Sequence, residues 1–215
     1  MPFDELIPAL LDGRGDAVAA GLTVTPERSR KVSFTKPYLS RFDEVVVTST
    51  TTTGIRKIED LAGRPVYVSS GSSYAQHLKE VSDKLSSAGL EPISIRHLGD
   101  HLETEEYLEL VHAGIVETTV ADAHIARLWK PVLDNIRIHD NLQVHSRGKI
   151  AWAIRRENTQ LREHLGRFAD KNRKGTVIGN IPFKRYYKNT KWARNPLGGK
   201  ERARLEQLIH YDLTP

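Results

Sequence analysis

Apolar residues at the start of the chain recur at helical spacing over 6–11, and glycines follow, which predicts a short helix. The run of small apolar residues over 16–21 is typical of a buried strand. Thr25 is a good N-cap and Pro26 fits a first helical position, so a second short helix is predicted to begin there. The β-branched run over 44–48 indicates another strand.

From residue 66 onward, strand patterns alternate with helical patterns. Strands separated by helices of about ten residues predict βαβ units, and therefore an α/β fold with mostly parallel sheets. The predicted strands are 66–69, 93–97, 118–121, 136–139 and 149–154, and the predicted helices are 74–85, 104–112, 124–129 and 161–168.

A polar, threonine-rich stretch over 49–53 precedes Gly54 and is interpreted as a connection between two lobes. The chain is therefore predicted to form two α/β lobes, of which the first is interrupted in sequence by the second. The expected segments are a first part of lobe 1 (1–48), lobe 2 (49–147), a return segment of lobe 1 (148–180) and a basic, aromatic connector and tail (181–215).

Composition narrows the class of protein. With 39% hydrophobic and 27% charged residues, the chain is predicted to be globular, and no window approaches the roughly 20 apolar residues of a membrane-spanning helix. The absence of cysteine excludes thiol chemistry, disulfides and cysteine-based zinc sites. No signal-peptide pattern is visible at the N-terminus, which fits either a cytoplasmic protein or a trimmed form of an exported one.

The segment from Gly21 to Arg28 combines groups that suit a carboxylate. A strand ends and a capped helix begins here, so backbone N–H groups, the Thr23 hydroxyl and the Arg28 guanidinium are expected together. Arginine can hold both oxygens of a carboxylate while a threonine donates a third hydrogen bond. A surface arginine near a helix N-terminus is the alternative interpretation of the same spacing.

A second polar turn, with Ser70, Gly71, Ser72 and Ser73, joins a predicted strand to a predicted helix. Such a turn presents backbone N–H groups to an anion. It is not a P-loop, because the Gly-Lys-Ser/Thr ending is missing. Capping of the following helix by Ser72 or Ser73 explains the serines as well as anion binding does.

Asp122 is the third candidate, because it stands where a predicted parallel strand ends and a helix begins. Open α/β sheets bind their ligands at the carboxyl ends of such strands, and an acid there suits an ammonium group. The alternative role for Asp122 is the N-cap of the next helix. Taken together, the three candidates predict a site for a small zwitterion.

Two other features are open to more than one interpretation. The tail over 184–204 has eight basic residues with interleaved aromatics, which could bind nucleic acid or an anionic cell wall, but a solvated face is the more common role. His97 and His101, four residues apart near Asp100 and Glu103, make a metal site conceivable, although Gly99 favours a loop there.

The common hydrolase motifs Gly-x-Ser-x-Gly and HExxH are absent, and no nucleophile with an evident base emerges. The residues therefore indicate binding without a reaction, and neither a cofactor nor a metal is expected.

The runs over 6–28 and 32–38 resemble the bacterial extracellular solute-binding proteins of the polar-amino-acid type, with the periplasmic binding protein type II fold. The runs over 58–74 and 120–122 are similar to the start of the second lobe of that family and to its closing acid. The resemblance implies that Thr23, Arg28 and Ser72 or Ser73 hold an α-carboxylate in a cleft between the lobes, and that Asp122 holds the α-ammonium.

The resemblance also implies two hinge strands, 44–48 and 149–154, and closure of the lobes on a ligand. The strand, helix and strand with which the family begins are missing before residue 6. The sheet edges left exposed in lobe 1 could support self-association.

The run over 175–196 is similar to the connector of membrane-bound lytic murein transglycosylases of the F type, in which a solute-binding module precedes a lysozyme-like domain. This resemblance implies a periplasmic module, associated with the outer membrane in the full-length protein. It would bind an amino acid, a peptide or a muropeptide, with peptidoglycan or a fused catalytic domain as partners and no nucleic acid. The catalytic glutamate would lie outside this sequence, so the chain itself is not expected to be an enzyme.

Three alternatives stay open. The chain could be the substrate-binding protein of an amino-acid ABC transporter. It could also be an enzyme like cyclohexadienyl dehydratase on the same fold, with Asp122 and His124 as the candidate acid or base. The third alternative is a scaffold that has lost its ligand.

Overall fold

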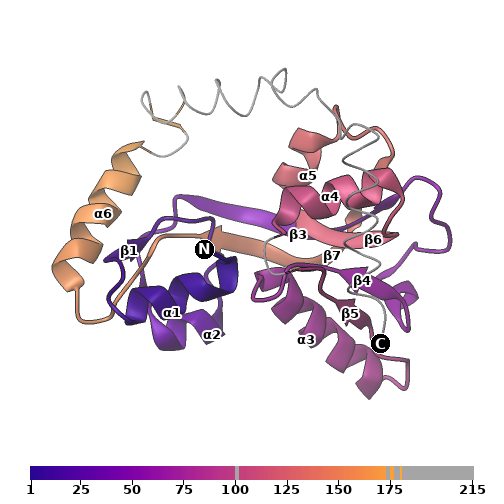
Figure 1. Cartoon of the computed structure of the whole chain (residues 1–215), viewed down its shortest axis with the longest axis horizontal. Helices are drawn as coiled ribbons and strands as arrows, with labels where there is room; N and C mark the ends of the chain where they lie inside the picture. The colour runs from indigo at the N-terminus through magenta and orange to yellow at the C-terminus, as the bar shows by residue number, and fades with distance from the viewer. Residues whose placement is uncertain (100–101, 173–174, 177–179, 181–215) are drawn as a thin grey trace. The chain divides into compact units, whose positions relative to one another are not determined.

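The computed structural model describes residues 1–99, 102–172, 175–176 and 180 (Figure 1). The chain divides into two compact units. Among the described residues, the first contains Met1–Phe42 and the chain from Ser146 to Asn180, and the second contains Asp43–His145. The predicted connector and tail over 181–215 lies outside the described residues.

The first unit has a small sheet in the order β1-β8-β2, in which β8 pairs antiparallel with both neighbours. Its core contains Leu10, Val18, Leu22, Val32 and Ala153. The elements of this unit are η1 (Phe3–Glu5), α1 (Leu6–Leu11), β1 (Ala17–Val18), α2 (Pro26–Lys31), β2 (Ser33–Phe34), β8 (Ala153–Ile154) and α6 (Thr159–Asn172).

The second unit is built on a five-stranded sheet in the order β5-β4-β6-β3-β7. The strands β3 and β7 also carry the chain from one unit into the other. The elements are β3 (Leu39–Ser49), η2 (Ile58–Leu61), β4 (Pro65–Tyr67), α3 (Ser73–Ser87), β5 (Ser94–Arg96), α4 (Thr104–Ala113), β6 (Thr118–Asp122), α5 (Ala123–Trp129) and β7 (Ile136–Ile150).

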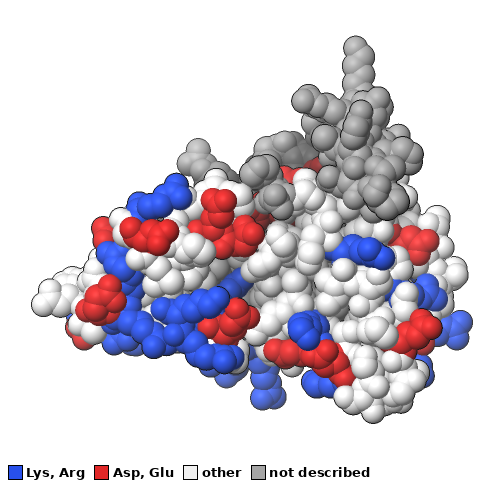
Figure 2. Space-filling model, turned by 60° about the horizontal axis from the view of Figure 1, so that its bottom comes forward, with Lys and Arg blue, Asp and Glu red and all other residues white. Residues whose placement is uncertain are grey.

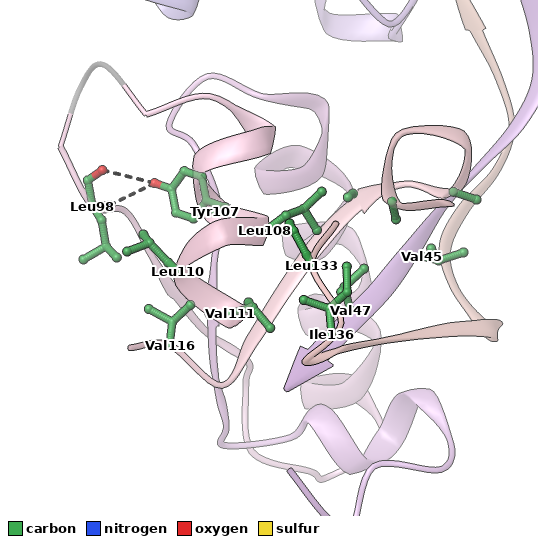
Figure 3. Packing of buried hydrophobic residues seen from close by; sticks show 13 residues of the cluster. Val45, Val47, Leu98, Tyr107, Leu108, Leu110, Val111, Val116, Leu133 and Ile136 are labelled. Atoms are coloured by element: carbon green, nitrogen blue, oxygen red, sulfur yellow. Dashed lines mark hydrogen bonds between the residues drawn. The ribbon is translucent and has the colours of Figure 1, made fainter. Parts of the chain in front are cut away.

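Helices cover both faces of this five-stranded sheet, with α3 on one face and α4 and α5 on the other (Figure 1). Successive side chains of a strand point to opposite faces, so neighbouring valines of β3 enter different cores. Val45 and Val47 pack with Leu108 and Ile136 on the α4 side (Figure 3). Val46 packs on the other side, in the core that contains residues of α3. Coverage of both faces explains why the three consecutive valines of β3, 45–47, are all apolar.

A tyrosine inside the α4-side core shows how a polar atom is accommodated there. Tyr107 is 1% exposed, and its hydroxyl accepts a hydrogen bond from the Leu98 N–H at 3.0 Å and donates to the Leu98 carbonyl at 3.3 Å (Figure 3). Both hydrogen-bonding roles of the hydroxyl are therefore satisfied, which removes most of the free-energy cost of burying it.

The prediction of an α/β fold is confirmed, but that of mostly parallel sheets holds only for part of the second unit. β4 pairs parallel with β5 and β6, whereas β3 pairs antiparallel with β6, and the sheet of the first unit is antiparallel. Parallel neighbours need a crossover connection, which the helices supply between β4, β5 and β6. β3 enters the sheet directly from the other unit without such a crossover, so it is free to run in the opposite direction.

The strand predicted over 149–154 is also interrupted. Its first part is the end of β7, its last part is β8, and between them the Trp152 backbone N–H donates to the Thr35 hydroxyl rather than to a strand. Among the described helices, none is both long and apolar enough to cross a membrane.

Candidate functional site

In the first unit, Arg28 lies on the short helix α2, yet its side chain is buried. The residue is 8% exposed, and its Nη1 donates a hydrogen bond of 2.9 Å to the Thr23 carbonyl. Its guanidinium carbon lies 5.4 Å from the centre of the Phe3 ring, a distance typical of a cation–π contact. The local sequence explains the placement, because Thr25 caps the helix by accepting a hydrogen bond from the Arg28 N–H. The alternative interpretation, an ordinary surface arginine, is therefore wrong.

The two other residues predicted beside Arg28 differ in their surroundings. Thr23 is 3% exposed and forms an isolated β-bridge with Ile150. Its carbonyl accepts a hydrogen bond from the Arg28 guanidinium, so the two residues are neighbours, and the role of the Thr23 hydroxyl toward a carboxylate stays a prediction. Gly21 is exposed, and a Cβ placed on it would meet no described atom within 4 Å. Its site role stays a prediction.

In the second unit, the serine turn before α3 is organised by helix capping. The Ser72 hydroxyl accepts a hydrogen bond from the Ala75 N–H at 3.2 Å and donates to the Ser69 carbonyl at 2.7 Å. Gly71 has a φ of 67°, a left-handed conformation that glycine adopts without strain. Ser70 is partly exposed. The capping interpretation therefore describes Ser72, and anion binding by this turn stays a prediction.

The Ser73 hydroxyl has a partner that its place in the sequence does not predict. This buried hydroxyl donates a hydrogen bond of 2.8 Å to the Glu44 carboxylate, and the second carboxylate oxygen lies 2.7 Å from Nδ1 of His77. Glu44 is 0% exposed. A charged residue at the head of a valine strand, and a histidine three residues after Tyr74 on the apolar face of a helix, are the signals that could have found this cluster.

Asp122 lies at the carboxyl end of β6 and is 4% exposed. It occupies the N-cap position of α5, but its side chain makes no capping hydrogen bond, so the capping alternative is wrong. Within the described part of the chain, its Oδ1 atom is buried without a hydrogen-bond partner. Burial and then the neighbouring Glu44 charge raise the pKa of Asp122 from 3.8 to about 8.

A buried carboxyl oxygen without a partner is costly, because it has lost water and gained nothing in return. A cation placed against Asp122 would supply both a hydrogen-bond donor and the opposite charge. The chemistry of this position is therefore that of a receptor for a positively charged group.

The described residues contain no cluster of three or more histidine, aspartate or glutamate side chains that could hold a metal ion. Nδ1 of His97 lies 2.7 Å from the Val68 carbonyl oxygen, while Asp100 and His101 lie outside the described residues. Lys and Arg side chains are interspersed with Asp and Glu side chains on the face shown in Figure 2. Exposed ion pairs of the described chain, such as that of Lys79 with Asp83 at 3.1 Å, contribute little to stability.

The fold is that of the type II periplasmic amino-acid-binding proteins. The chain belongs to the bacterial extracellular solute-binding proteins, family 3, whose family model matches residues 1–184.

A curated relative is membrane-bound lytic murein transglycosylase F of Desulfosudis oleivorans, which is 30% identical over 185 residues. The match covers 86% of this chain but 38% of that relative, so the chain spans about two fifths of its length. ABC transporter arginine-binding protein 1 of Escherichia coli K12 is 35% identical over 78 residues, covering 36% of this chain and 31% of that protein.

Among solved structures, an ancestral arginine-binding protein bound to arginine has a TM-score of 0.70 and 28% sequence identity, covering 86% of this chain and 78% of that one. The E. coli relative and this structural neighbour are both arginine-binding proteins.

Proposed function

We propose that this chain binds a free amino acid or a small peptide in the bacterial periplasm, through the charged groups of the ligand backbone. Asp122 would receive the α-ammonium and Arg28 the α-carboxylate. The observation that carries the proposal is the Asp122 carboxyl, which is 4% exposed and has a buried oxygen without a hydrogen-bond partner in the described chain.

The carboxylate half of the proposal is supported by Arg28. A guanidinium is always charged and presents a planar set of donors that matches a carboxylate. The contact with the Thr23 carbonyl fixes the orientation of the guanidinium before a ligand arrives. In this proposal the Thr23 hydroxyl, the backbone at Gly21 and the turn over 70–73 supply further donors.

Because Arg28 belongs to the first unit and Asp122 to the second, the proposal requires one ligand to engage both. A ligand that bridges two units favours the arrangement in which both contacts are made. β3 and β7 are the strands that would bend, since each contains a boundary between the units.

The test is calorimetry of the purified chain with L-arginine, L-glutamine and a muropeptide. Arg28→Ala should weaken binding by well over tenfold, since a charge-assisted hydrogen bond is lost, while Arg30→Ala on the same helix should change it little because Arg30 is exposed. Asp122→Asn should weaken binding, and the exposed Asp134→Asn is its matched control. If the folded protein binds none of these ligands, the proposal is refuted.

We further propose that the binding module serves a cell-wall lytic enzyme of the F type, which it would regulate or target. The alignment with the F-type relative extends over 86% of this chain, whereas that with the E. coli transporter protein extends over 36%. The test is release of muropeptides from peptidoglycan by the whole gene product, with and without the amino acid that binds. A gene product that supports amino-acid uptake and leaves peptidoglycan intact would favour the second candidate, an ABC transporter receptor.

A further inference from the structure

Glu44 is the centre of a buried polar cluster in the second unit. The Ser73 hydroxyl donates to Oε1 of Glu44 at 2.8 Å, and Nδ1 of His77 lies 2.7 Å from Oε2. All three residues are buried, with Glu44 at 0%, His77 at 4% and Ser73 at 6% exposure. An ionised carboxylate at this depth requires such partners, because desolvation without them costs several kcal/mol.

The cluster continues to a partly exposed side chain. The ring of His77 stacks on the ring of His145, with 3.8 Å between centroids and 6° between planes. His145 lies on β7 and is partly exposed. Burial, and then the neighbouring His77, lower the pKa of His145, while Glu44, Glu80 and Asp43 act in the opposite direction.

Glu44 also faces the residue that the proposed function assigns to the ligand ammonium. β3 and β6 are antiparallel, and Glu44 lies directly opposite Asp122 in their register. Side chains of directly opposed residues project from the same face of a sheet and are close neighbours. Two buried carboxyl groups in this arrangement do not both carry a negative charge easily, because each charge disfavours the other.

We propose that Glu44 is a positioning residue that makes binding of a cationic group at Asp122 release a proton. The inference rests on the proposed function. Without a ligand, both oxygens of Glu44 have partners in Ser73 and His77, whereas one oxygen of Asp122 has none in the described chain, so the proton resides on Asp122. A ligand ammonium then replaces that proton: Asp122 loses it to the solvent, and the resulting carboxylate pairs with the ammonium. No bond other than the O–H bond of Asp122 is broken, and charge is balanced by the arriving cation.

The other groups around Asp122 act on the same equilibrium. Tyr74 of α3 forms a hydrogen bond that lowers the pKa of Asp122, while the charge of Glu105 on α4 raises it less than that of Glu44. The coupling predicts that affinity for a cation falls by up to tenfold for each pH unit below the pKa of Asp122, because the proton and the ammonium compete for one carboxylate.

The first experiment needs no ligand. Carbon-13 NMR of the side-chain carboxyls follows Asp122, whose signal is assigned by its loss in Asp122→Asn. The wild-type signal should titrate at about 8, and Glu44→Gln, which can still accept from Ser73, should lower that midpoint by at least one unit. Asp43→Asn, one residue along the same strand, should leave the midpoint unchanged. A midpoint near 4, or one that Glu44→Gln does not move, would overturn the inference.

The second experiment uses L-arginine as the probe. Calorimetry in buffers of different ionisation enthalpy counts the protons released, which at pH 7 should approach one for the wild type and be clearly smaller for Glu44→Gln. Arginine that binds without proton release overturns the inference but not the proposed function. If no ligand binds, the proposed function fails while the NMR titration still decides the role of Glu44.

A second variant is available if Glu44→Gln does not fold. His77→Gln removes the imidazole that lies against Glu44 and should change the midpoint of the Asp122 titration. An unchanged midpoint contradicts the inference.

Discussion

The hydroxyl of Tyr74 accepts a hydrogen bond of 3.2 Å from the backbone N–H of Asp122. This bond joins the first turn of α3 to the end of β6, where the strand gives way to α5. Burial raises the pKa of Tyr74 well above its ordinary value of 10, so the hydroxyl keeps its proton at any pH relevant to the protein. Tyr74 therefore fixes the backbone that carries the candidate cation receptor.

Tyr74→Phe should lower the free energy of unfolding by about 1–3 kcal/mol, because the buried Asp122 N–H loses its acceptor. It should also raise the pKa of Asp122 further, since the Tyr74 hydrogen bond lowers it. Urea denaturation measures the first effect and NMR the second. Tyr67→Phe on β4 is the matched control, because no hydrogen bond of the Tyr67 hydroxyl is found in the described part of the chain. Equal stability of the two variants would contradict this prediction.

The raised pKa of Asp122 predicts a pH dependence of stability. In the folded state the pKa is about 8, against an ordinary value of 3.8, so between these values the folded state binds the proton more tightly than the unfolded state. The contribution of Asp122 to stability is therefore fully present below pH 4 and is lost as pH rises to 8, by up to about 1.4 kcal/mol per pH unit.

Asp122→Asn cannot ionise and should escape this loss. The stability of the variant relative to the wild type should rise between pH 5 and pH 8, as measured by urea denaturation at each pH. The relative measure is needed because His145, whose pKa is lowered, contributes in the opposite sense in both proteins. A difference between the two proteins that does not vary with pH would show that Asp122 is ionised throughout.

Gly148 lies against the ring of Phe42. A Cβ on Gly148 would stand 2.5 Å from Cζ of Phe42, which is 6% exposed and has little room to move. Gly148→Ala should destabilise the protein by about 1–3 kcal/mol through overpacking. Gly15→Ala, which meets nothing within 4 Å, is the control, and Phe42→Leu should recover part of the loss in the double variant. Unchanged melting temperatures would contradict the predicted clash.

Arg155 ties the returning chain to the N-terminal part of the first unit. Its guanidinium donates to the carbonyls of Leu10 and Gly15 at 3.0 and 2.6 Å and pairs with Asp16 at 2.6 Å. Arg155→Lys should destabilise the chain by about 1–3 kcal/mol, because an ammonium cannot reproduce the planar set of donors. Arg156→Lys, at an exposed position whose side chain makes one hydrogen bond within the described residues, to the Ser29 carbonyl, should cost less. Thermal unfolding of both variants checks the ranking.

Local features of the chain were predictable because they depend on neighbours in sequence. The cap by Thr25 and the helix beginning at Pro26 involve residues within one helical turn, and the structure confirms both. The burial of Arg28 was not predictable, since it depends on the Phe3 ring and the Thr23 carbonyl, which reach it only when the first unit folds. Spacing favoured a surface arginine for this reason.

The sequence alone determined the alternating strands and helices, the carboxylate at the end of β6 and the family to which the chain is similar, because each is recorded in residues a few positions apart. Only the tertiary structure decided three other features. They are the direction of β3, the fact that Ser72 caps α3 while Ser73 donates to Glu44, and the position of Glu44 opposite Asp122 in the sheet. Those relationships arise from strand register and helix packing between segments far apart in the chain. A buried charge takes its properties from such neighbours, so the pKa of Asp122 became apparent only once β3 and α3 were in place.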